Sequence, residues 1–420
     1  MNIVADTKQE FISGLTPSSI YLNQEAGIKA QETISTTKLP TTRIEAWKYT
    51  RLAKIGKINF SNEKSSLTSI ANYNIDSDAF TLVFVNGHYS SELSNTDDYQ
   101  GFSIKKLSDC DSSELPKSNL KIEGELFNAI NTNFLNDGVL IDIPNKSIVN
   151  RTIQILHILE GNQTISNFRT IVKAGAFSKA SIIQGFFSEN AEKSFANNVT
   201  EAFVGENAFL TIDKVQSEDQ GNFHISTEQI DQEKDSTFTI NTLTLNGSLV
   251  RNNLNINVNG QNCTSNLNGA YLLKEKQHVD NHTVVDHKVP NCESNELYKG
   301  VIDDQSTAVF NGKVFVRKDA QKINAFQSNG NVLLSDNSTV NSKPELEIYA
   351  DDVKCSHGST TGQLDEEAVF YLRARGLSEK SARHLMVSAF IGDVLEKVEN
   401  EAVLSFTSNI LRSRFGWNID

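Results

Sequence analysis

The sequence predicts a mainly β protein with helical regions at both ends. Between about residues 147 and 350, β-branched and aromatic residues alternate with polar ones, as in residues 152–158 and 254–258, and such alternation is typical of strands. Asn-Gly turn dipeptides recur through the same stretch, and proline is nearly absent from it. After residue 363 the apolar residues take up helical spacing instead.

The N-terminal region predicts short helices followed by a mixed unit. Residues 20–34 have apolar positions at helical spacing. Residues 43–50 combine aromatic and charged side chains, and we expect an amphipathic surface helix there with Trp47 turned inward. Short apolar runs between residues 79 and 143 end in turn signals, which indicates a small mixed α/β unit.

The central region fits two architectures, a β-sandwich or a parallel β-helix. Asn-Gly pairs taken singly favour hairpins and hence a sandwich. More than 200 residues without a domain break, and many asparagines near strand ends that could stack between coils, favour the β-helix. The strand pattern alone supports both equally. The dipeptides are Asn246-Gly247, Asn259-Gly260, Asn268-Gly269, Asn311-Gly312 and Asn329-Gly330.

The C-terminal tail predicts consecutive helices. Asp365 is a suitable N-cap for the first, Gly376 can end it in a left-handed conformation, and Ser378 can cap the second. The second helix has an apolar stripe, and a last segment around residues 406–415 continues it. The stripe consists of Ala382, Leu385, Met386, Ala389, Phe390, Val394 and Leu395. It can pack on the β region or lie in the groove of a partner.

Composition narrows the function classes. At 420 residues the chain exceeds the usual size of one hydrophobic core, so two or three domains are expected. A net charge of −13 and a pI near 5.2 argue against binding to nucleic acid or to an anionic membrane. No apolar run is long enough to span a bilayer, and we expect no secretory signal. The four cysteines are widely scattered, so a reduced, cytoplasmic protein is expected.

Cys355 and His357 form the most informative pair in the chain. They lie where the strand-like region ends, and on an extended strand their side chains share one face. A thiol beside an imidazole can bind a metal, relay a proton or hold a sulfur species. Two ligands are too few for a closed zinc site, which takes four. The pair therefore predicts half of a site, and the residues alone support a plain packing role equally well.

Two other groups of thiols and imidazoles are weaker candidates. One group lies within fifteen residues and consists of His278, His282, His287 and Cys292. Its spacing matches no zinc motif, and on a strand the first and third histidines fall on opposite faces, so we expect structural roles. Cys110 and Cys263 have no ionisable neighbours in the sequence, and we expect both to be buried packing residues.

Motifs of the common enzyme classes are absent from the sequence. It contains no phosphate-binding Gly-x-x-x-x-Gly-Lys-Ser/Thr loop and no Gly-x-Ser-x-Gly elbow. Asp351 and Asp352 could be a carboxylate pair for polysaccharide chemistry. Adjacent residues on a strand point to opposite faces, however, so the two cannot flank one bond.

Longer stretches of the sequence resemble a known family. The stretches are residues 43–50, 280–301, 309–314, 320–325, 344–348, 354–358 (Lys-Cys-Ser-His-Gly) and 370–376 (Phe-Tyr-Leu-Arg-Ala-Arg-Gly). Together they are similar to the SufB/SufD family of iron–sulfur cluster assembly proteins, and the Arg-Ile-Glu-Ala-Trp-Lys-Tyr-Thr segment resembles the SufD branch. The similarity is densest between about residues 280 and 395.

Departures from SufB place the chain nearer to SufD. SufB has His-Glu-Ala-Thr-Thr where residues 357–361 read His-Gly-Ser-Thr-Thr. SufB carries a cysteine on its penultimate strands, whereas residues 335–340 contain none. The cysteine-rich N-terminal motif of many SufB proteins is missing too.

The resemblance implies a right-handed parallel β-helix core, which decides between the two architectures above. It also implies α-helical regions on both sides of that core. We therefore expect an N-terminal helical and mixed α/β region at residues 1–146, the β-helix at 147–362 and a C-terminal helical domain at 363–420.

The resemblance further implies a non-catalytic subunit of a complex with SufB and two copies of the ATPase SufC, with the tail helices docking on SufC. His357, as a metal ligand, would face SufB and with Cys355 help to bind the nascent iron–sulfur cluster, and a part in iron acquisition is expected as well. The isolated subunit is expected to hold no stable cluster and to form a homodimer. The rival class is a β-helix polysaccharide lyase or hydrolase.

Overall fold

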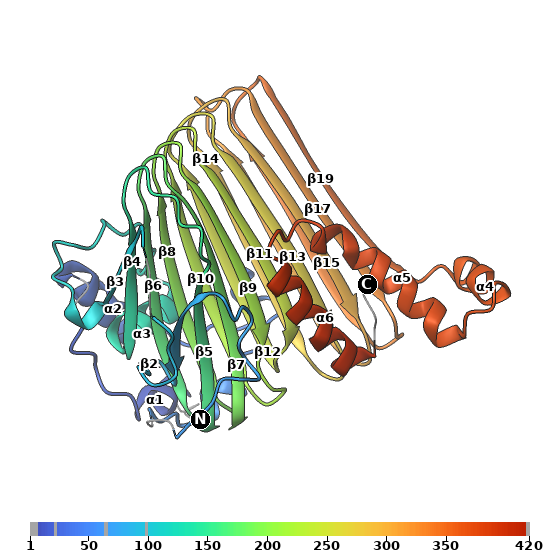
Figure 1. The fold of residues 1–420 in the computed structure, drawn as a ribbon, viewed down its shortest axis with the longest axis horizontal. Coiled ribbons are helices and arrows are strands. Elements are labelled where there is room, and N and C mark those ends of the chain that lie inside the picture. The colour runs from blue at the N-terminus through green and yellow to red at the C-terminus, as the bar shows by residue number, and fades with distance from the viewer. Residues whose placement is uncertain (1–6, 21–22, 63–65, 97–99, 417–420) are drawn as a thin grey trace.

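Parallel strands wind into a β-helix in the computed structural model, which describes residues 7–20, 23–62, 66–96 and 100–416. Consecutive strands of the coil alternate between two sheets, so that β7, β9 and β11 lie side by side in one sheet and β8, β10 and β12 in the other (Figure 1). The predicted parallel β-helix is confirmed. A sandwich built from antiparallel hairpins is excluded, since the strands within each sheet of the coil run parallel.

The elements have the following bounds. The first sheet contains, in spatial order, β19 (Val353–Gln363), β17 (Ile323–Leu333), β15 (Glu293–Ile302), β13 (Thr264–Leu273), β11 (Thr237–Asn246), β9 (Phe209–Ser217), β7 (Lys179–Glu192), β5 (Ile153–Asn162), β1 (Phe80–Val85) and β2 (His88–Tyr89). The second contains β18 (Thr339–Ile348), β16 (Thr307–Val316), β14 (His278–His287), β12 (Leu249–Val258), β10 (Phe223–Gln232), β8 (Phe195–Val204), β6 (Ile165–Ala174), β4 (Asp137–Ile143) and β3 (Ser103–Lys106). The helical segments are α1 (Thr7–Ile12), α2 (Gln24–Thr36), α3 (Leu126–Asn133), α4 (Glu366–Ala374), α5 (Glu379–Leu395) and α6 (Glu401–Phe415), with the 3-10 turns η1 (Glu45–Trp47), η2 (Ile55–Lys57) and η3 (Leu107–Asp109).

One corner of the coil explains why asparagine and aspartate are frequent near strand ends. At this corner a residue in the left-handed region donates its backbone N–H to a carbonyl of the next coil. Asn207, Asp235 and Asn291 do so, with φ of 53°, 59° and 62°. Asparagine and aspartate tolerate this conformation better than most residues. The same left-handed turn with its hydrogen bond to the next coil therefore repeats at this corner.

Several Asn-Gly pairs lie inside strands rather than in hairpins. Asn311-Gly312 is in the middle of β16 and Asn329-Gly330 in the middle of β17, both in parallel register with their neighbours. Among the pairs inside strands, Gly269 and Gly312 make room for large interior side chains. A Cβ on Gly269, for example, would lie 2.3 Å from the ring of Tyr298. These two dipeptides, which favoured hairpins, thus serve packing inside the solenoid.

The N-terminal region covers part of the second sheet. Helix α2 begins at Gln24 with Asn23 as its cap, so it starts later than the predicted residues 20–34, of which residues 21–22 lie outside the described part. Trp47 is buried as predicted and packs on the Arg251 guanidinium, 3.8 Å from its ring centroid. Its segment forms one 3-10 turn rather than the expected amphipathic helix.

The predicted mixed unit at residues 79–143 contains β1 to β4 and α3. Its strands β1 and β4 pair in parallel with β5 and β6, and so extend the two sheets. The division of the chain into regions at residues 1–146, 147–362 and 363–420 stays a prediction.

The tail helices have the predicted caps but a different buried face. Asp365 accepts hydrogen bonds from two backbone N–H groups of α4, Ser378 caps α5, and Gly376 has a φ of 100°. Leu385, in the predicted stripe of α5, is 49% exposed, whereas Val387 and Ile391 outside it are buried. The predicted stripe was partly wrong because α5 packs over β13 and β15 through a neighbouring row of its surface.

Candidate functional site

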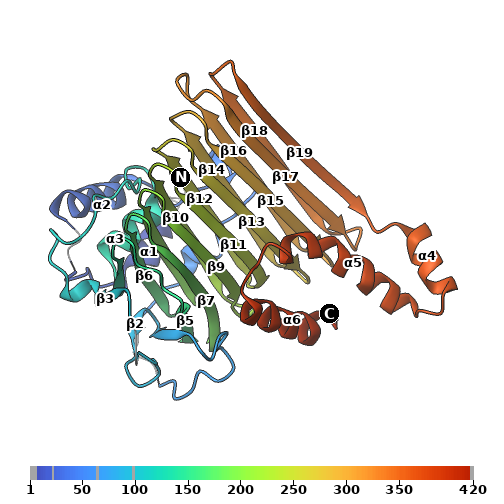
Figure 2. The same ribbon diagram turned by 45° about the horizontal axis from the view of Figure 1, so that its top comes forward.

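The solenoid ends in two strands that each have one free edge. Within the described residues, β19 pairs only with β17 and β18 only with β16. Figure 2 shows both at the edge of the solenoid farthest from the N-terminal helices. An edge strand presents unpaired N–H and C=O groups to another chain. Pro344 within β18 fits this position, because proline cannot donate to a central ladder.

Cys355 and His357 lie on the inward face of β19. Cys355 is aligned with Ala325, a residue of the interior core, and His357 with Gln327, so all four share that face. Cys355 is half-buried, and burial raises the pKa of its thiol. Lys354 falls on the opposite face and does not activate it. His357 is exposed. The structure therefore brings both predicted residues to the open end, and their role there stays a prediction.

A row of polar side chains leads from the last coil into the solenoid. Ser359 Oγ donates to Ser342 Oγ at 2.7 Å, and Ser342 Oγ donates to Asn329 Oδ1 at 2.8 Å. Deeper in, Asn331 Nδ2 donates to Asn329 Oδ1 at 2.8 Å, and the Tyr271 hydroxyl donates to Asn331 Oδ1 at 2.6 Å. Sequence reasoning missed this row because its members come from separate coils. Only the strand register could have found it.

The open end supplies few metal-binding groups by itself. Among the described residues, no group of three or more His, Cys, Asp or Glu side chains is placed to hold an ion. Cys355 and His357 offer one sulfur and one imidazole. Iron in iron–sulfur clusters is held mainly by cysteine thiolates, and histidine replaces them in some clusters. Any cluster at this end would need further ligands.

Separate hydrogen-bond partners hold His278, His282 and His287, so these histidines do not meet in one site. His278 Nε2 is 2.8 Å from the Thr50 hydroxyl, and His282 Nε2 is 2.9 Å from Asp280. His287 points inward, with Nε2 2.9 Å from the Ser294 hydroxyl. The histidines therefore stabilise the coil and its contact with the N-terminal region, in agreement with the expected structural roles.

Two expectations about the cysteines were wrong in detail. Cys263 is buried, but it has an ionisable neighbour, because Cys292 occupies the equivalent position on the next coil. The contact between the two thiols lowers the pKa of Cys263 and raises that of Cys292. Cys110 is half-exposed instead of buried, and its thiol donates to the Lys106 carbonyl.

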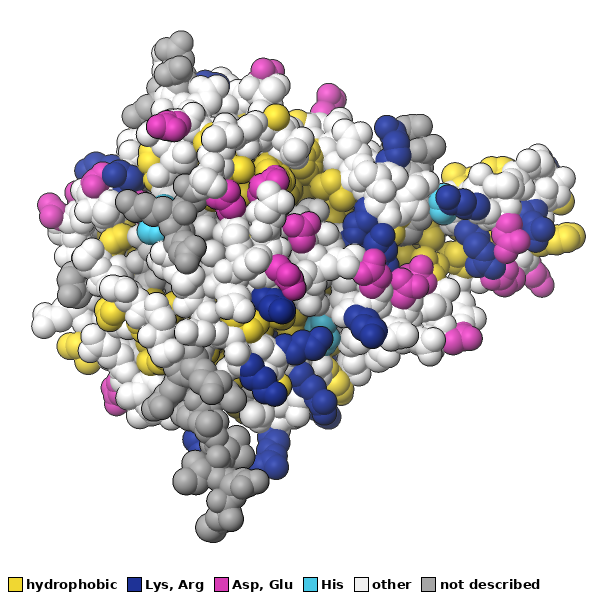
Figure 3. All heavy atoms as spheres, turned by 90° about the horizontal axis from the view of Figure 1, so that it is seen from below, with side chains coloured by type: hydrophobic (Ala, Val, Ile, Leu, Met, Phe, Trp, Pro, Cys, Tyr) yellow, Lys and Arg dark blue, Asp and Glu magenta, His cyan; other side chains and the backbone are white. Residues whose placement is uncertain are grey.

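Helix α4 projects from the body of the molecule with an apolar surface. Phe370 is 70% exposed and Tyr371 57% exposed, while Val369 is its buried hydrophobic residue. Figure 3 shows hydrophobic side chains on this projection at the right, beside charged ones. Exposed aromatic residues that lie together are typical of a protein-binding surface.

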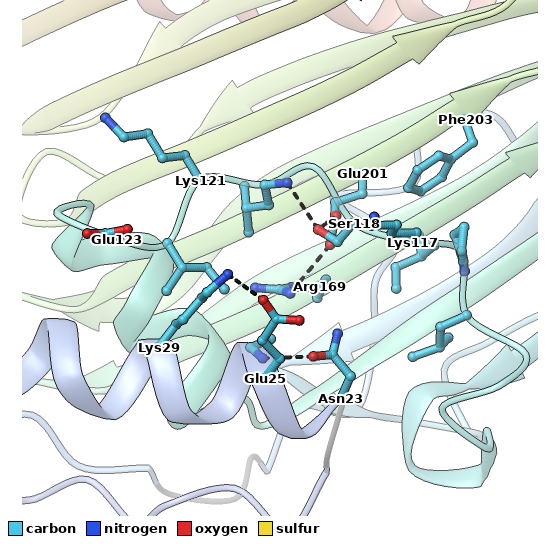
Figure 4. Close-up of a pocket in the computed structure, with 16 residues that line it drawn as sticks. Asn23, Glu25, Lys29, Lys117, Ser118, Lys121, Glu123, Arg169, Glu201 and Phe203 are labelled. Carbon is cyan, nitrogen blue, oxygen red and sulfur yellow. Dashed lines mark hydrogen bonds and ion pairs between the residues drawn. The ribbon is translucent and has the colours of Figure 1, made fainter.

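A separate hollow of about 730 Å³ lies between α2, residues 115–123 and the outer face of β6 and β8 (Figure 4). Carboxylates and basic groups line it, the combination that would suit a polysaccharide enzyme. Glu25, however, is bound by Lys29 at 2.6 Å, and the fully buried Glu201 lies 3.4 Å from Arg169. The first pair lies within α2 and the second between β6 and β8, and both leave their carboxylates engaged.

Comparison with known proteins favours the cluster assembly family over a polysaccharide enzyme. The family model described as the SufBD core domain of the SUF system for FeS cluster assembly matches residues 157–390. A model of the N-terminal region of SufBD proteins matches residues 13–155. The chain belongs to the SufBD family. It is thus a SufD-like iron–sulfur cluster assembly protein, as the sequence resemblance implied.

Similar proteins occur in bacteria and plants. An iron–sulfur cluster assembly SufBD family protein of Synechocystis is 33% identical over 93% of this chain and 90% of its own length. The iron–sulfur cluster assembly protein SufD of Escherichia coli is 30% identical, with 87% of each chain covered. The chloroplastic protein ABCI7 of Arabidopsis thaliana is 28% identical over 95% of this chain. In the described part of the present family member, no helix is long and apolar enough to cross a membrane.

Proposed function

We propose that this chain is a non-catalytic, cytoplasmic subunit of a cluster assembly complex and pairs end to end with a SufB-type chain. The nascent iron–sulfur cluster is its cargo, built at the joint between the two solenoids, and the chain takes part in acquiring the iron. His357 supplies an iron ligand there, with Cys355 as a second contributor.

The observation that carries this proposal is the position of His357 on the inward face of an unpaired terminal coil. A partner that adds strands to β18 and β19 would enclose this side chain together with its own ligands. Neutral imidazole binds a metal without a large proton penalty near pH 7. The raised pKa of Cys355 makes its thiolate less available, which is why it is the secondary member.

Helix α4 and the outer side of α5 form the proposed docking surface for a SufC-type ATPase. Phe370, Tyr371 and Leu385 are exposed there, while the opposite side of α5 is committed to the solenoid. Hydrolysis would take place in the ATPase and reach this chain as a movement of the docked helices. In the absence of the SufB-type chain, the free edges of β18 and β19 would pair two copies of this chain.

The test is to co-express the His357→Ala variant with SufB- and SufC-type partners and to purify the complex anaerobically. We expect iron and acid-labile sulfide to fall while the subunit composition stays unchanged. Lys354→Ala is the matched control, because it removes a side chain from the other face of the same strand. Wild-type cluster content in the His357→Ala complex would refute the proposal.

A further inference from the structure

Three residues on successive coils form one row that ends at His357. Glu296 in β15 is aligned with Gln327 in β17, and Gln327 is aligned with His357 in β19. Residues in register on parallel strands share a face and lie about 5 Å apart. The row is therefore a carboxylate, an amide and an imidazole, in that order toward the open end.

The amide of Gln327 has a fixed orientation. Gln327 is 3% exposed and Glu296 5% exposed, and Gln327 Nε2 donates to Glu296 Oε2 at 2.7 Å. Burial raises the pKa of Glu296 to about 7. Above that pH its ionised carboxylate only accepts hydrogen bonds, so the amide nitrogen faces Glu296. In the described part of the chain, Gln327 Oε1 is buried and has no hydrogen-bond partner.

The opposite sheet leaves space for this amide. A Cβ on Gly312 would lie 2.3 Å from Gln327 Nε2, so a larger residue there would displace the side chain. A buried carbonyl oxygen without a donor is costly, and such a group calls for an explanation. The side chain aligned with it on the next coil is His357, whose neutral ring has one N–H donor.

We propose that Gln327 is the positioning residue of His357. When a partner covers the open end, Gln327 Oε1 accepts one ring N–H of His357, and the other ring nitrogen keeps its lone pair for iron. Glu296 holds the amide in the orientation that makes this possible. The inference rests on the proposed iron-binding role of His357, and adds how its tautomer and ring direction are set. Acceptors of this kind commonly raise metal affinity by about 10- to 100-fold.

The test compares Gln327→Met with Gln184→Met in the anaerobic complex with SufB- and SufC-type partners. Methionine keeps the length of the side chain and removes the carbonyl. Gln184 is a matched control, because it is also a buried interior glutamine with side-chain hydrogen bonds, on the distant strand β7. The readouts are the Kd for Fe(II) and the ¹⁵N spectrum of the labelled histidines, in which His357→Ala identifies the His357 signals.

For Gln327→Met we expect Fe(II) to bind about tenfold more weakly and the His357 signals to change from one tautomer to a mixture. Gln184→Met should leave both unchanged. Wild-type affinity and an unchanged tautomer in Gln327→Met would overturn the inference. If His357→Ala also binds Fe(II) like the wild type, the proposed function itself fails, so the two failures are distinguishable.

If Gln327→Met does not fold, the isosteric variant Glu296→Gln tests the positioning role of Gln327 instead. An amide at position 296 can donate to Gln327, which frees the Gln327 amide to turn over and present its N–H groups to His357. We expect the opposite tautomer of His357 to gain population in this variant. A tautomer ratio equal to that of the wild type would contradict the positioning role.

Discussion

Lys214 and Glu228 form an ion pair inside the solenoid, with Lys214 Nζ 2.6 Å from Glu228 Oε1 although they belong to opposite sheets. Both side chains are almost fully buried. The ammonium also donates to Ser226 and Asn252, at 2.5 and 2.9 Å. Burial lowers the pKa of Lys214, and the contact with Glu228 opposes that shift. The pair therefore joins the two sheets across the interior.

Removing one partner of this pair should cost more than removing both. In Lys214→Met, Glu228 remains buried without its cation, and we expect the free energy of unfolding to fall by about 3–5 kcal/mol. Lys214→Met/Glu228→Met should recover a large part of this loss, since no unpaired charge is left. Urea denaturation of the three proteins measures the difference. A double variant no more stable than the single one would contradict the prediction.

Asp213 should make the protein less stable as the pH rises. Burial raises the pKa of Asp213 to about 6, and Glu399 acts in the same direction, while the hydrogen bond from Asn241 opposes the shift. The folded state therefore holds a proton that the unfolded state releases near pH 4. The contribution of Asp213 to stability is highest below that pH and falls until about pH 6, by about 3 kcal/mol at most. Asp213→Asn should remove this contribution, which urea midpoints at pH 4.5 and 7 would measure.

The exposed Asp319 gives the control for that experiment, because it lies on the surface at the end of β16. Asp319→Asn should follow the wild-type pH profile. An Asp213→Asn profile that also matches the wild type would show that Asp213 is ionised in the folded state at pH 4.5.

The aromatic residues of α4 should be needed for the ATPase but not for the fold. Phe370→Ser/Tyr371→Ser should abolish co-purification of the SufC-type ATPase and change the free energy of unfolding by only about 0.5 kcal/mol, as exposed positions do. Deleting the whole tail is less informative, because α5 and α6 cover apolar side chains of the first sheet. Phe177→Ser, at a 53% exposed position on the solenoid corner, is the matched control. Retained ATPase in the double variant would place the docking surface elsewhere.

Local sequence signals predicted the strands but not how they are connected in space. Alternation placed Cys355 and His357 on one face without any knowledge of neighbours. The Asn311-Gly312 dipeptide, by contrast, is identical in a hairpin and in a strand whose glycine makes room for Gln327. That difference depends on the opposite sheet, which local sequence does not encode. The family resemblance decided between the sandwich and the β-helix.

The row of Glu296, Gln327 and His357 could not be predicted from the sequence for a related reason. Glu296, Gln327 and His357 are 31 and 30 residues apart, which is one coil each. Once the coil length is known, that spacing becomes a usable signal. Without it, Glu296 and Gln327 look like ordinary polar residues of exposed strand faces. The buried face of α5 was missed similarly, because Leu385 and Val387 are equally apolar and only the contact with β13 and β15 selects between them.

The two ends of the solenoid differ in a way that limits end-to-end association. At one end β2 and β3 are short antiparallel strands of two and four residues, and short edge strands are poor templates for pairing. At the other end β18 and β19 offer ten and eleven residues. A chain with long free edge strands at only one end can pair with one other chain through that end. End-to-end association of such chains stops at a pair and does not propagate into a fibre.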